Sequence, residues 1–486
     1  MIKTNKQEKI EKQAKIAIIG GGVAGSSVAL YFAKLGLDIT LFEKEKSLVN
    51  GPPFCHLHAG GNLYREISDF QCVTLLKQSI DFLRFYPYIV DYRPTVIALP
   101  IGDNSTPEAL LPRLKLLREK YKELIAKDAK NEVLGEVKNY YKTYSKEEIE
   151  ELKTKELVKN PKNCDEWMIP VAKNINLSKI QFPLIMVQEY GLNLFRLSSG
   201  ISLALESLDS VKLHIGSIVH NVQKNLDGWS VSFVENDKSY TKQFDYLINA
   251  AGFRSGKIDD FIGTPCKAMV EFKAAYVSRC DSFKDIKFPE IIFHGKRGTP
   301  QGMGQFTPYP NGYFQLHAMT KDITLYEDGL VSNTILSCQP KLGQDFIKKI
   351  EKSWTKEEIE ERTKAAISHL SQFIPYFSSA RVGSKPLFGA QQIPGDDPTL
   401  RVAEVSFPSK RYARCEIVKV SSVLDMIDAI AKNLASLGYI SHKTIGTREF
   451  AYDLHLDDAK LSKRAKSIAI KRNYPDSLAT RTTPKG

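Results

Sequence analysis

The sequence predicts an α/β fold, α+β overall, in which a domain with a parallel sheet is interleaved with a domain built on a mainly antiparallel sheet plus a helical insertion. Three observations predict it. A strand, a glycine-rich turn, a helix and a second strand occupy residues 16–42, which is how a βαβ unit opens. Charged helical patterns dominate residues 101–187, and after residue 266 short strand-like runs alternate with Gly, Pro and aromatic residues.

Hydrophobic period and turn chemistry place the individual elements. They predict, in chain order, strands at 16–19 and 38–42 around a helix at 25–35, a helix at 195–208, strands at 211–215, 218–222, 229–234 and 244–252, and a last apolar-periodic helix at 421–437. Asp227-Gly228 is a hairpin turn signal between two of these strands. Ser145 and Glu148 form a capping box, which predicts a helix start within the insertion.

The chain of 486 residues exceeds the length of roughly 250–300 at which a single core stops growing, so two domains are expected. The element pattern divides it into an N-terminal extension (1–15), three parts of the first domain (16–100, 188–265 and 378–440), two parts of the second domain (101–187, the helical insertion, and 266–377) and a basic C-terminal tail (441–486).

The net charge of +12 is concentrated at the ends of the chain. Residues 1–15 hold five Lys and two Glu (+3), and residues 459–486 hold eight Lys or Arg and one Asp (+7), which together make +10. No apolar run is long enough for a membrane span, the first fifteen residues lack the apolar centre of a signal peptide, and the seven cysteines are scattered without metal-ligand spacing. A cytoplasmic protein without a metal site is expected, with any membrane contact peripheral.

The segment GGGVAG at residues 20–25 satisfies GxGxxG. In this motif Gly20 permits the tight turn, Gly22 lets the backbone approach a pyrophosphate, and Gly25 allows close packing of helix on strand. Glu43, at the end of the second strand, is placed to accept a hydrogen bond from a ribose 2′-hydroxyl. Together these features predict a Rossmann-like dinucleotide site.

The choice between FAD and NAD rests on the middle of the chain. FDYLINAAG at residues 244–252 is an apolar strand that ends in a small-residue turn, and the chain holds no second GxGxxG for a nicotinamide domain. We therefore expect FAD as the cofactor.

The N-terminal motif, QEYGLNLFRLSSGISLAL at 188–205, the strand with Ile218-Val219-His220, and DYLINAAG occur in an order that resembles FAD-dependent oxidoreductases of the D-amino-acid oxidase superfamily. The resemblance implies that Val219 contacts adenine through its backbone and that Gly252 lies beside the pyrophosphate. The full set of cofactor-binding residues that it implies is Gly20, Gly22, Val23, Ala24, Gly25, Glu43, Lys44, His58, Ala59, Gly60, Val219, Ala251 and Gly252.

Within the superfamily, CHLHAGGNLY at residues 55–64 resembles the flavin-flanking segment of malate:quinone, L-2-hydroxyglutarate and glycerol-3-phosphate dehydrogenases. The usual C-terminal glycine-rich flavin loop is not recognisable; residues 384–395 and 414–422 stand in its region. Oxidation of a 2-hydroxy acid needs a base for the hydroxyl proton and cations for the carboxylates. The candidate bases are His58, then His56, with His317 as the alternative, and the candidate clamps are Arg254 and Lys385, with Tyr309 and Tyr313 nearby.

Because the chain holds neither a nicotinamide domain nor cluster-binding cysteines nor a haem motif, the reduced flavin should pass electrons to oxygen, a quinone or a protein carrier, and of these a quinone is expected. A quinone lies in a membrane, so the basic ends predict contact with an anionic lipid surface, through the apolar residues Leu461, Ile468 and Ile470 among the cations. Two alternatives stay open: an amine or amino-acid oxidase that uses oxygen, and an RNA-modifying flavoprotein. Tyr474 is the only aromatic residue in the basic stretch 459–486, and nucleic-acid binding usually adds aromatic side chains on which bases stack. Nucleic acid is therefore not the expected partner.

Overall fold

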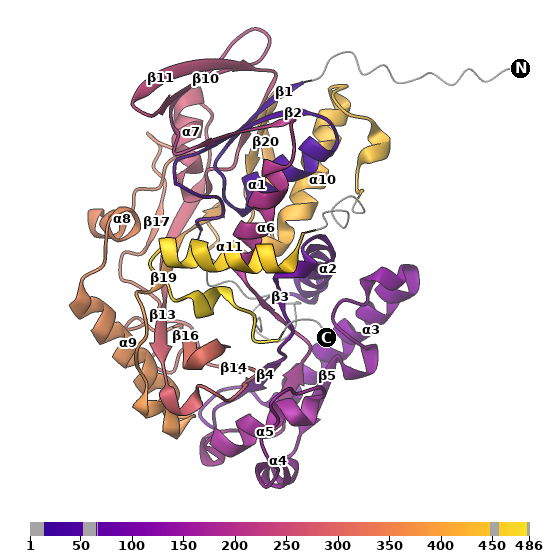
Figure 1. Cartoon of the computed structure of the whole chain (residues 1–486), viewed down its shortest axis with the longest axis vertical. Helices are drawn as coiled ribbons and strands as arrows, with labels where there is room; N and C mark the ends of the chain where they lie inside the picture. Colours follow the sequence, from indigo (N-terminus) through magenta and orange to yellow (C-terminus); the bar gives the residue numbers. More distant parts are fainter. Residues whose placement is uncertain (1–13, 52–64, 66, 448–455, 484–486) are drawn as a thin grey trace, which may run out of the picture.

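The computed structural model describes residues 14–51, 65, 67–447 and 456–483. In these residues two sheet-based domains lie one above the other, and the C-terminal helix crosses between them (Figure 1). The predicted class, α/β and α+β overall, is confirmed, since one sheet is almost wholly parallel and the other mainly antiparallel.

The sheet of the first domain has the strand order β20-β21-β12-β1-β2-β8 in the described residues, and only β20 runs antiparallel to its neighbour. Its strands are β1 (Lys15–Ile19), β2 (Asp38–Glu43), β8 (Val211–Ile215), β12 (Tyr246–Asn249), β20 (Val405–Ser409) and β21 (Tyr412–Cys415). Both faces of β1 are covered, because Ile16 and Ile18 enter one hydrophobic core while Ala17 and Ile19 enter another. A continuous apolar strand is the pattern that such double burial requires.

Helices cover one face of this sheet and a small antiparallel sheet covers the other. The helices are α1 (Val23–Lys34), α2 (Asp69–Phe85), α6 (Leu194–Glu206) and α10 (Val423–Ser436). The opposite face carries β9 (Ile218–Lys224), β10 (Trp229–Glu235), β11 (Lys238–Phe244) and α7 (Ser255–Ile262). The hairpin predicted at Asp227-Gly228 is confirmed, because β9 and β10 pair antiparallel across it.

The second domain has the strand order β17-β13-β16-β15-β14-β4-β6-β5, and β18 and β19 also pair with β13. The strands are β4 (Thr95–Ala98), β5 (Tyr141–Tyr144), β6 (Leu184–Val187), β13 (Ala268–Arg279), β14 (Glu290–Phe293), β15 (Gly304–Tyr309), β16 (Tyr313–Ala318), β17 (Leu330–Ser332), β18 (Arg381–Val382) and β19 (Leu387–Pro394). β4 joins this sheet from within the range 16–100, and β5 and β6 join it from within the range 101–187. The insertion therefore supplies strands as well as helices.

The remaining helices are α3 (Leu111–Lys127), α4 (Lys146–Lys153), α5 (Cys164–Asn174), α8 (Gln344–Glu351), α9 (Lys356–Ser371) and α11 (Asp458–Lys471). The capping box at Ser145 and Glu148 is present at the start of α4. A short two-stranded sheet of β3 (Val90–Asp91) and β7 (Gly191–Leu192) links the two domains. Among the helices that the structure describes, none combines the length and apolar character needed to cross a bilayer.

The end of the chain differs from the expected tail. Residues 458–471 form α11, which packs along α6, and residues 472–483 continue between the domains (Figure 1). Leu461 is fully buried and Ile468 is 8% exposed, so the apolar residues expected to meet lipid lie against protein. Of the three, only Ile470 is exposed. The physical reason is that α6 supplies an apolar partner from far along the chain, which the local sequence does not reveal.

Candidate active site

The turn between β1 and α1 contains glycines because nearby backbone leaves no room for side chains. Gly20 has φ +104°, and a Cβ there would lie 2.3 Å from the carbonyl oxygen of Ala250. A Cβ on Gly25 would lie 1.9 Å from the carbonyl oxygen of Gly20. A Cβ on Gly22 would meet no atom within 4 Å. The turn is thus packed tightly against β12 and open at Gly22, where a pyrophosphate would approach the backbone.

The first turn of α1 presents backbone N–H groups to this open side. Gly22 is the N-cap, no side chain caps the helix, and the first turn, which includes Val23 and Ala24, holds no acidic residue. Gly252, in the turn after β12, has φ +60° and also has open space around its Cβ position. An unblocked helix N-terminus between two open glycines fits a diphosphate.

Glu43 is held beside the glycine turn by two backbone hydrogen bonds. Its Oε2 accepts from the Gly21 amide at 2.6 Å and its Oε1 from the Glu45 amide at 2.7 Å. The residue is 7% exposed, and burial raises the pKa of its carboxyl above the ordinary value although both hydrogen bonds oppose that rise. The carboxylate is therefore already oriented for a ribose hydroxyl. The next residue, Lys44, forms an ion pair with Glu45 at 3.2 Å.

The predicted adenine-side residue, Val219, is brought close to Glu43. The Ser217 amide donates to the Glu43 carbonyl at 2.9 Å, and β9 begins one residue later. Opposite β10, the register shifts so that Val219 pairs with Phe233, which leaves His220 as an extra residue in β9. His56, His58, Ala59 and Gly60 lie outside the described residues, as does Cys55.

The second sheet turns one face toward the first domain. On β13, Ala275 and Val277 pack with Phe195 of α6, which identifies that face. Val277 is the register partner of Gln315 on β16, so Gln315 and, two residues on, His317 share this face. The intervening residues of β16 point to the opposite side, into the core under α9.

Five polar side chains form this surface, which we call the polar face. Gln305 lies opposite His317 and Thr307 opposite Gln315, while Glu290 is on the neighbouring strand β14. Their exposures are 2% for Gln305, 1% for Thr307, 1% for Gln315, 8% for His317 and 2% for Glu290. Burying so many polar groups costs free energy that an apolar core would avoid, and such groups are typical of a binding site. The structure thus places His317, the alternative base, in a buried polar site.

Arg93 connects the polar face to the link between the domains. Its Nη1 lies 3.0 Å from Asp91 Oδ2 and its Nη2 lies 3.1 Å from Glu290 Oε2. Burial opposes its charge, but the two carboxylates together raise the pKa of Arg93 above its ordinary value. Arg93 is 4% exposed, and its Nε has no hydrogen-bond partner among the described residues. This donor is available to an anionic or carbonyl group.

Lys273 occupies the same side of β13, nearer the loop that leads to α10. Its Nζ lies 2.7 Å from Glu271 Oε2 and 3.3 Å from Gln391 Oε1, and Gln391 Nε2 donates to the Val418 carbonyl at 3.1 Å. Burial lowers the pKa of Lys273 to about 8 against the opposing effect of Glu271. An amine that titrates near neutrality can take up or release a proton during turnover.

The two predicted carboxylate clamps have different surroundings. Lys385 lies beside β13, since the amide of Gly383 donates to the Val277 carbonyl at 2.8 Å, and its Nζ is 4.6 Å from the centroid of the Tyr474 ring. Tyr309 and Tyr313 border the same apolar cluster as Tyr474. Arg254 instead forms an ion pair with Glu351 of α8. Of these two cations, the structure places Lys385 on the side of the polar face.

Residues 15–131 match the family model described as FAD dependent oxidoreductase (DAO). The chain is an FAD-dependent oxidoreductase, and the matched residues include the glycine turn and Glu43. FAD is its cofactor, and the open glycine turn, the helix N-terminus and Glu43 fit the ADP half of that molecule. A search of curated proteins finds no match to the sequence.

Solved structures of similar fold include three oxidoreductases. They are L-amino acid deaminase from Proteus vulgaris (TM-score 0.56, 11% identity, 89% of this chain and 97% of that one), glycerol-3-phosphate dehydrogenase from Bacillus halodurans complexed with FAD (0.55, 12%, 96% and 74%) and glycine oxidase from Geobacillus kaustophilus (0.53, 12%, 87% and 95%). At these identities the likeness establishes the fold.

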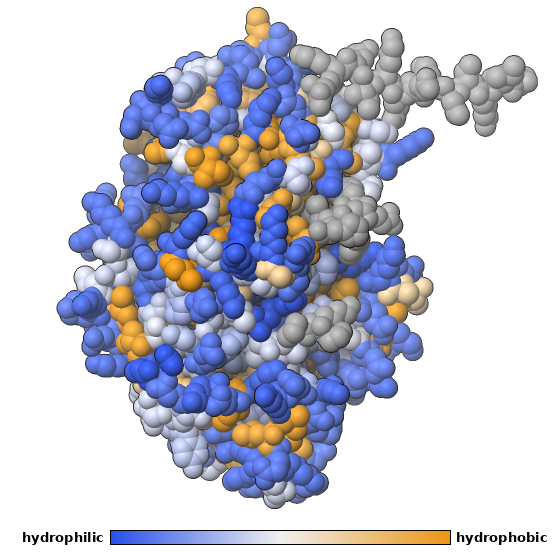
Figure 2. Space-filling view, viewed as in Figure 1, coloured by the Kyte–Doolittle hydropathy of each residue, from blue (hydrophilic) through white to orange (hydrophobic). Residues whose placement is uncertain are grey.

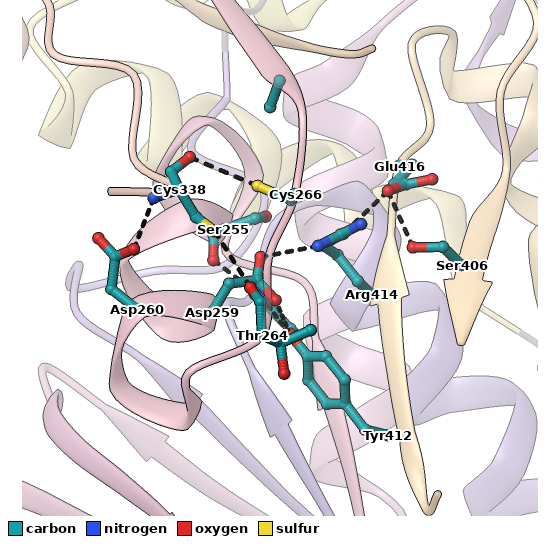
Figure 3. Close-up of polar contacts among 12 residues, drawn as sticks. Ser255, Asp259, Asp260, Thr264, Cys266, Cys338, Ser406, Tyr412, Arg414 and Glu416 are labelled. Atoms are coloured by element: carbon teal, nitrogen blue, oxygen red, sulfur yellow. Dashed lines mark hydrogen bonds and ion pairs between the residues drawn. The ribbon is translucent and has the colours of Figure 1, made fainter. Parts of the chain in front are cut away.

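A buried ionic cluster joins β21 to α7 (Figure 3). Arg414, at the end of β21, lies 3.2 Å from Asp259 Oδ2 and donates to Glu416 Oε1 at 2.8 Å. Tyr412 donates to Asp259 Oδ1 at 2.6 Å, and the Asn249 amide donates to the Tyr412 hydroxyl at 2.9 Å. Asn249 is the last residue of β12, so this cluster anchors the start of the Gly252 turn.

Arg93, Lys273, Glu290 and Thr307 were not among the residues proposed from sequence. One signal for Lys273 was present: Glu271 and Lys273 sit two residues apart in an otherwise apolar strand pattern, which puts both charges on one buried face. Arg93 carries no comparable local signal, because its partner Glu290 comes from β14, which pairs with β4 from far along the chain.

Proposed function

We propose that this FAD-dependent oxidoreductase oxidises a small 2-hydroxy acid, of the malate or 2-hydroxyglutarate type, with His317 as the base that takes the hydroxyl proton. Bound FAD supplies the acceptor for the hydride. The observation that carries the proposal is a buried histidine on a polar sheet face that is turned toward the cofactor domain. Neutral imidazole suits this task because its pKa lies near neutrality.

The positions of the proposed base and of two cations suit a substrate with two acidic groups. His317 and Lys385 lie on either side of β13, so about two strand spacings, roughly 10 Å, separate their backbones. Lys385 can extend toward a carboxylate from one side, and the Nε of Arg93 from the domain link. Thr307 and Gln315 between them can hydrogen-bond the remaining oxygens.

A second candidate is the oxidation of an amine or amino acid with oxygen as the acceptor. It is favoured by two of the structures of similar fold, which are described as a glycine oxidase and an L-amino acid deaminase. An amine substrate would need its nitrogen neutral before hydride loss, and His317 could serve as that base too. The chemistry of the site therefore allows either a hydroxyl or an amine on the α-carbon.

Anaerobic reduction of the flavin separates these candidates. We expect L- or D-malate, or L- or D-2-hydroxyglutarate, to bleach the flavin absorbance within seconds, and glycine or other amino acids to leave it unchanged. Bleaching by amino acids alone, with peroxide formed on readmission of air, would replace the first proposal by the second. Retained colour with every acid and amine in the panel would reject both.

The role of His317 is tested by H317Q against H369Q as a matched control. His369 is also a buried histidine, 9% exposed, but it belongs to α9 on the opposite side of the sheet. We expect H317Q to slow flavin reduction by roughly 10²–10⁴-fold, the usual contribution of a general base, while H369Q stays near wild type. Equal rates in both variants would remove His317 from the mechanism.

For the electron acceptor we propose a quinone reached by peripheral contact with an anionic membrane. On the face in Figure 2, hydrophilic residues cover most of the surface, and apolar residues interrupt them around α11. Lys460, Lys463 and Lys471 of α11 are exposed cations, while most of the apolar side of this helix is buried. The contact would therefore be electrostatic and sensitive to salt.

Vesicle binding tests that contact without removing α11. We expect the variant K460Q/K463Q/K471Q to bind phosphatidylserine vesicles more weakly than wild type, with equal binding of both to neutral vesicles. Reduction of a soluble quinone analogue by substrate-reduced enzyme should be faster than reduction of oxygen. The same affinity of both proteins for anionic vesicles would discard the membrane contact.

A further inference from the structure

The C-terminal segment, residues 456–483, contacts both domains. Along α11, Arg196 of α6 pairs with Asp458 and donates to Ser462, and Arg464 pairs with Glu206. After α11 the chain reverses at Asn473, which has a positive φ of 58°. The segment is therefore bound to the cofactor domain through α6 before it reaches the second domain.

Beyond that reversal the segment is tied to the second domain and to the link. The Tyr474 hydroxyl donates to the Pro386 carbonyl at 2.8 Å, and the Asn311 amide donates to Ser477 Oγ at 2.9 Å. The amides of Thr482 and Thr483 donate to the Asp91 carboxylate at 3.0 and 2.8 Å. The end of the chain thus runs from one domain to the other, along the face of the second sheet that is turned toward the first domain.

Arg472, the first residue after α11, reaches into the loop that follows β2. Its Nη1 donates to the Val49 carbonyl at 2.9 Å, and its Nη2 donates to Ser47 Oγ at 2.9 Å and to the Leu48 carbonyl at 2.7 Å. Ser198 of α6 donates to the same Leu48 carbonyl at 2.7 Å. One guanidinium therefore holds three consecutive residues of this loop.

Two of those residues, Leu48 and Val49, contact the glycine turn. The Val49 amide donates to the Gly21 carbonyl at 2.8 Å, and a Cβ on Gly21 would lie 2.6 Å from Leu48 Cδ2. Val49 has φ 55°, a left-handed conformation that a β-branched residue rarely adopts and that persists only when its surroundings enforce it. The hydrogen bonds from Arg472 to the Val49 and Leu48 carbonyls are part of that enforcement.

Among the residues that the structure describes, the hydrogen-bond partners of Arg472 are all uncharged. They are two backbone carbonyls and the hydroxyls of Ser47 and Ser198, and the Nε has no partner among the described residues. Burial lowers the pKa of Arg472 to about 10, although Glu43 and Glu45 are near enough to oppose that effect. A cation buried without a directly bonded carboxylate is an expensive way to stabilise a fold, which favours a role specific to this loop.

We propose that Arg472 is a positioning residue of the FAD site, which holds residues 47–49 against the glycine turn and so makes the C-terminal segment part of the cofactor-binding structure. FAD binding and docking of this segment are then linked, and each strengthens the other. The proposal concerns cofactor retention and is independent of which substrate is oxidised.

The test compares R472M and R472K with R464M. Arg464 lies within α11, and its ion pair with Glu206 makes R464M a control for general loosening of that helix. Apoprotein is titrated with FAD, and the Kd is read from quenching of flavin fluorescence; urea unfolding of each apoprotein is measured alongside. We expect R472M to raise the Kd at least tenfold and R464M to stay within twofold. R472K should raise the Kd less than R472M, because a Lys ammonium keeps the charge and the hydrogen-bond donors but lacks the planar fork of Arg.

A Kd for R472M within twofold of R464M would overturn the proposal, whatever its urea midpoint. If R472M yields no folded apoprotein, hydrogen exchange at residues 472–478 of the wild-type protein is measured with and without FAD. Slower exchange on addition of FAD supports the link. Exchange unchanged by FAD in these residues, with protection in the glycine turn, refutes it.

Discussion

Replacement of Glu43 by Gln isolates the charge that the structure places beside the glycine turn. The carboxylate is 7% exposed and accepts two backbone hydrogen bonds, from Gly21 at 2.6 Å and Glu45 at 2.7 Å. The amide of Gln has one oxygen, so one of these two N–H groups would face an NH₂ donor. We expect the apoprotein to lose about 1–3 kcal/mol of unfolding free energy, the usual cost of an unsatisfied buried donor.

The larger effect is expected on FAD. A hydrogen bond from a ribose hydroxyl to a carboxylate contributes about 1.5–3 kcal/mol, so E43Q should raise the Kd for FAD roughly 10–100-fold. E45Q is the matched control, because Glu45 is an adjacent acid whose side chain pairs with Lys44. Isothermal titration of each apoprotein with FAD measures the difference. Equal affinity of E43Q and E45Q for FAD would refute the role assigned to Glu43.

The pH dependence provides an independent check on the same group. The pKa of Glu43 is raised in the folded protein, so the native state binds this proton more readily than the unfolded chain. Between the ordinary value of 4.5 and the raised pKa, unfolding free energy therefore falls as pH rises. FAD affinity should rise with pH over the same range, because protonation of Glu43 removes the charged acceptor for the ribose hydroxyl. E43Q should lack this step.

Three further predictions concern packing and charge. In G25A the new Cβ would lie 1.9 Å from the Gly20 carbonyl oxygen, so α1 must move away from β1; overpacking should cost about 1–3 kcal/mol in thermal unfolding and abolish copurified flavin. R414M leaves the fully buried Asp259 without its cation and should cost about 3–5 kcal/mol in urea unfolding, with D259N/R414M recovering part of the loss. Because the pKa of Lys273 is about 8 when folded and 10.5 ordinarily, wild-type stability should rise relative to K273M between pH 8 and 10.5; parallel curves would contradict that burial.

Local signals predicted the cofactor half of the fold accurately. The strand at 16–19 is Lys15–Ile19, the helix at 25–35 is Val23–Lys34, and the strand at 211–215 is Val211–Ile215. Each depends on hydrophobic period and turn chemistry within a few residues. The same holds for the GxGxxG motif and Glu43, because the βαβ unit brings them together within about thirty residues.

The substrate half could not be assembled in this way. The polar face combines β14, β15 and β16, and its orientation toward the cofactor domain depends on the pairing of β13 with β16. A strand pattern says which residues share a face but not which neighbour that face meets. His317 was identified as a candidate from its strand. Arg93 and Lys273 become candidates only once the structure places them beside Glu290 and Gln391, respectively.

The sequence by itself determined the βαβ unit with its glycine turn, because the backbone geometry and the one acid that fit the ADP half of FAD are encoded in a continuous stretch. Only the tertiary structure decided what the C-terminal segment does. Its cations and apolar residues indicated a lipid-facing tail, yet Leu461 and Ile468 are buried against α6 and Arg472 reaches the loop after β2, more than 400 residues earlier in the chain. Hydrophobic burial is non-directional, so an apolar face is covered by whichever partner the fold brings to it, and long-range packing rather than local sequence makes that choice.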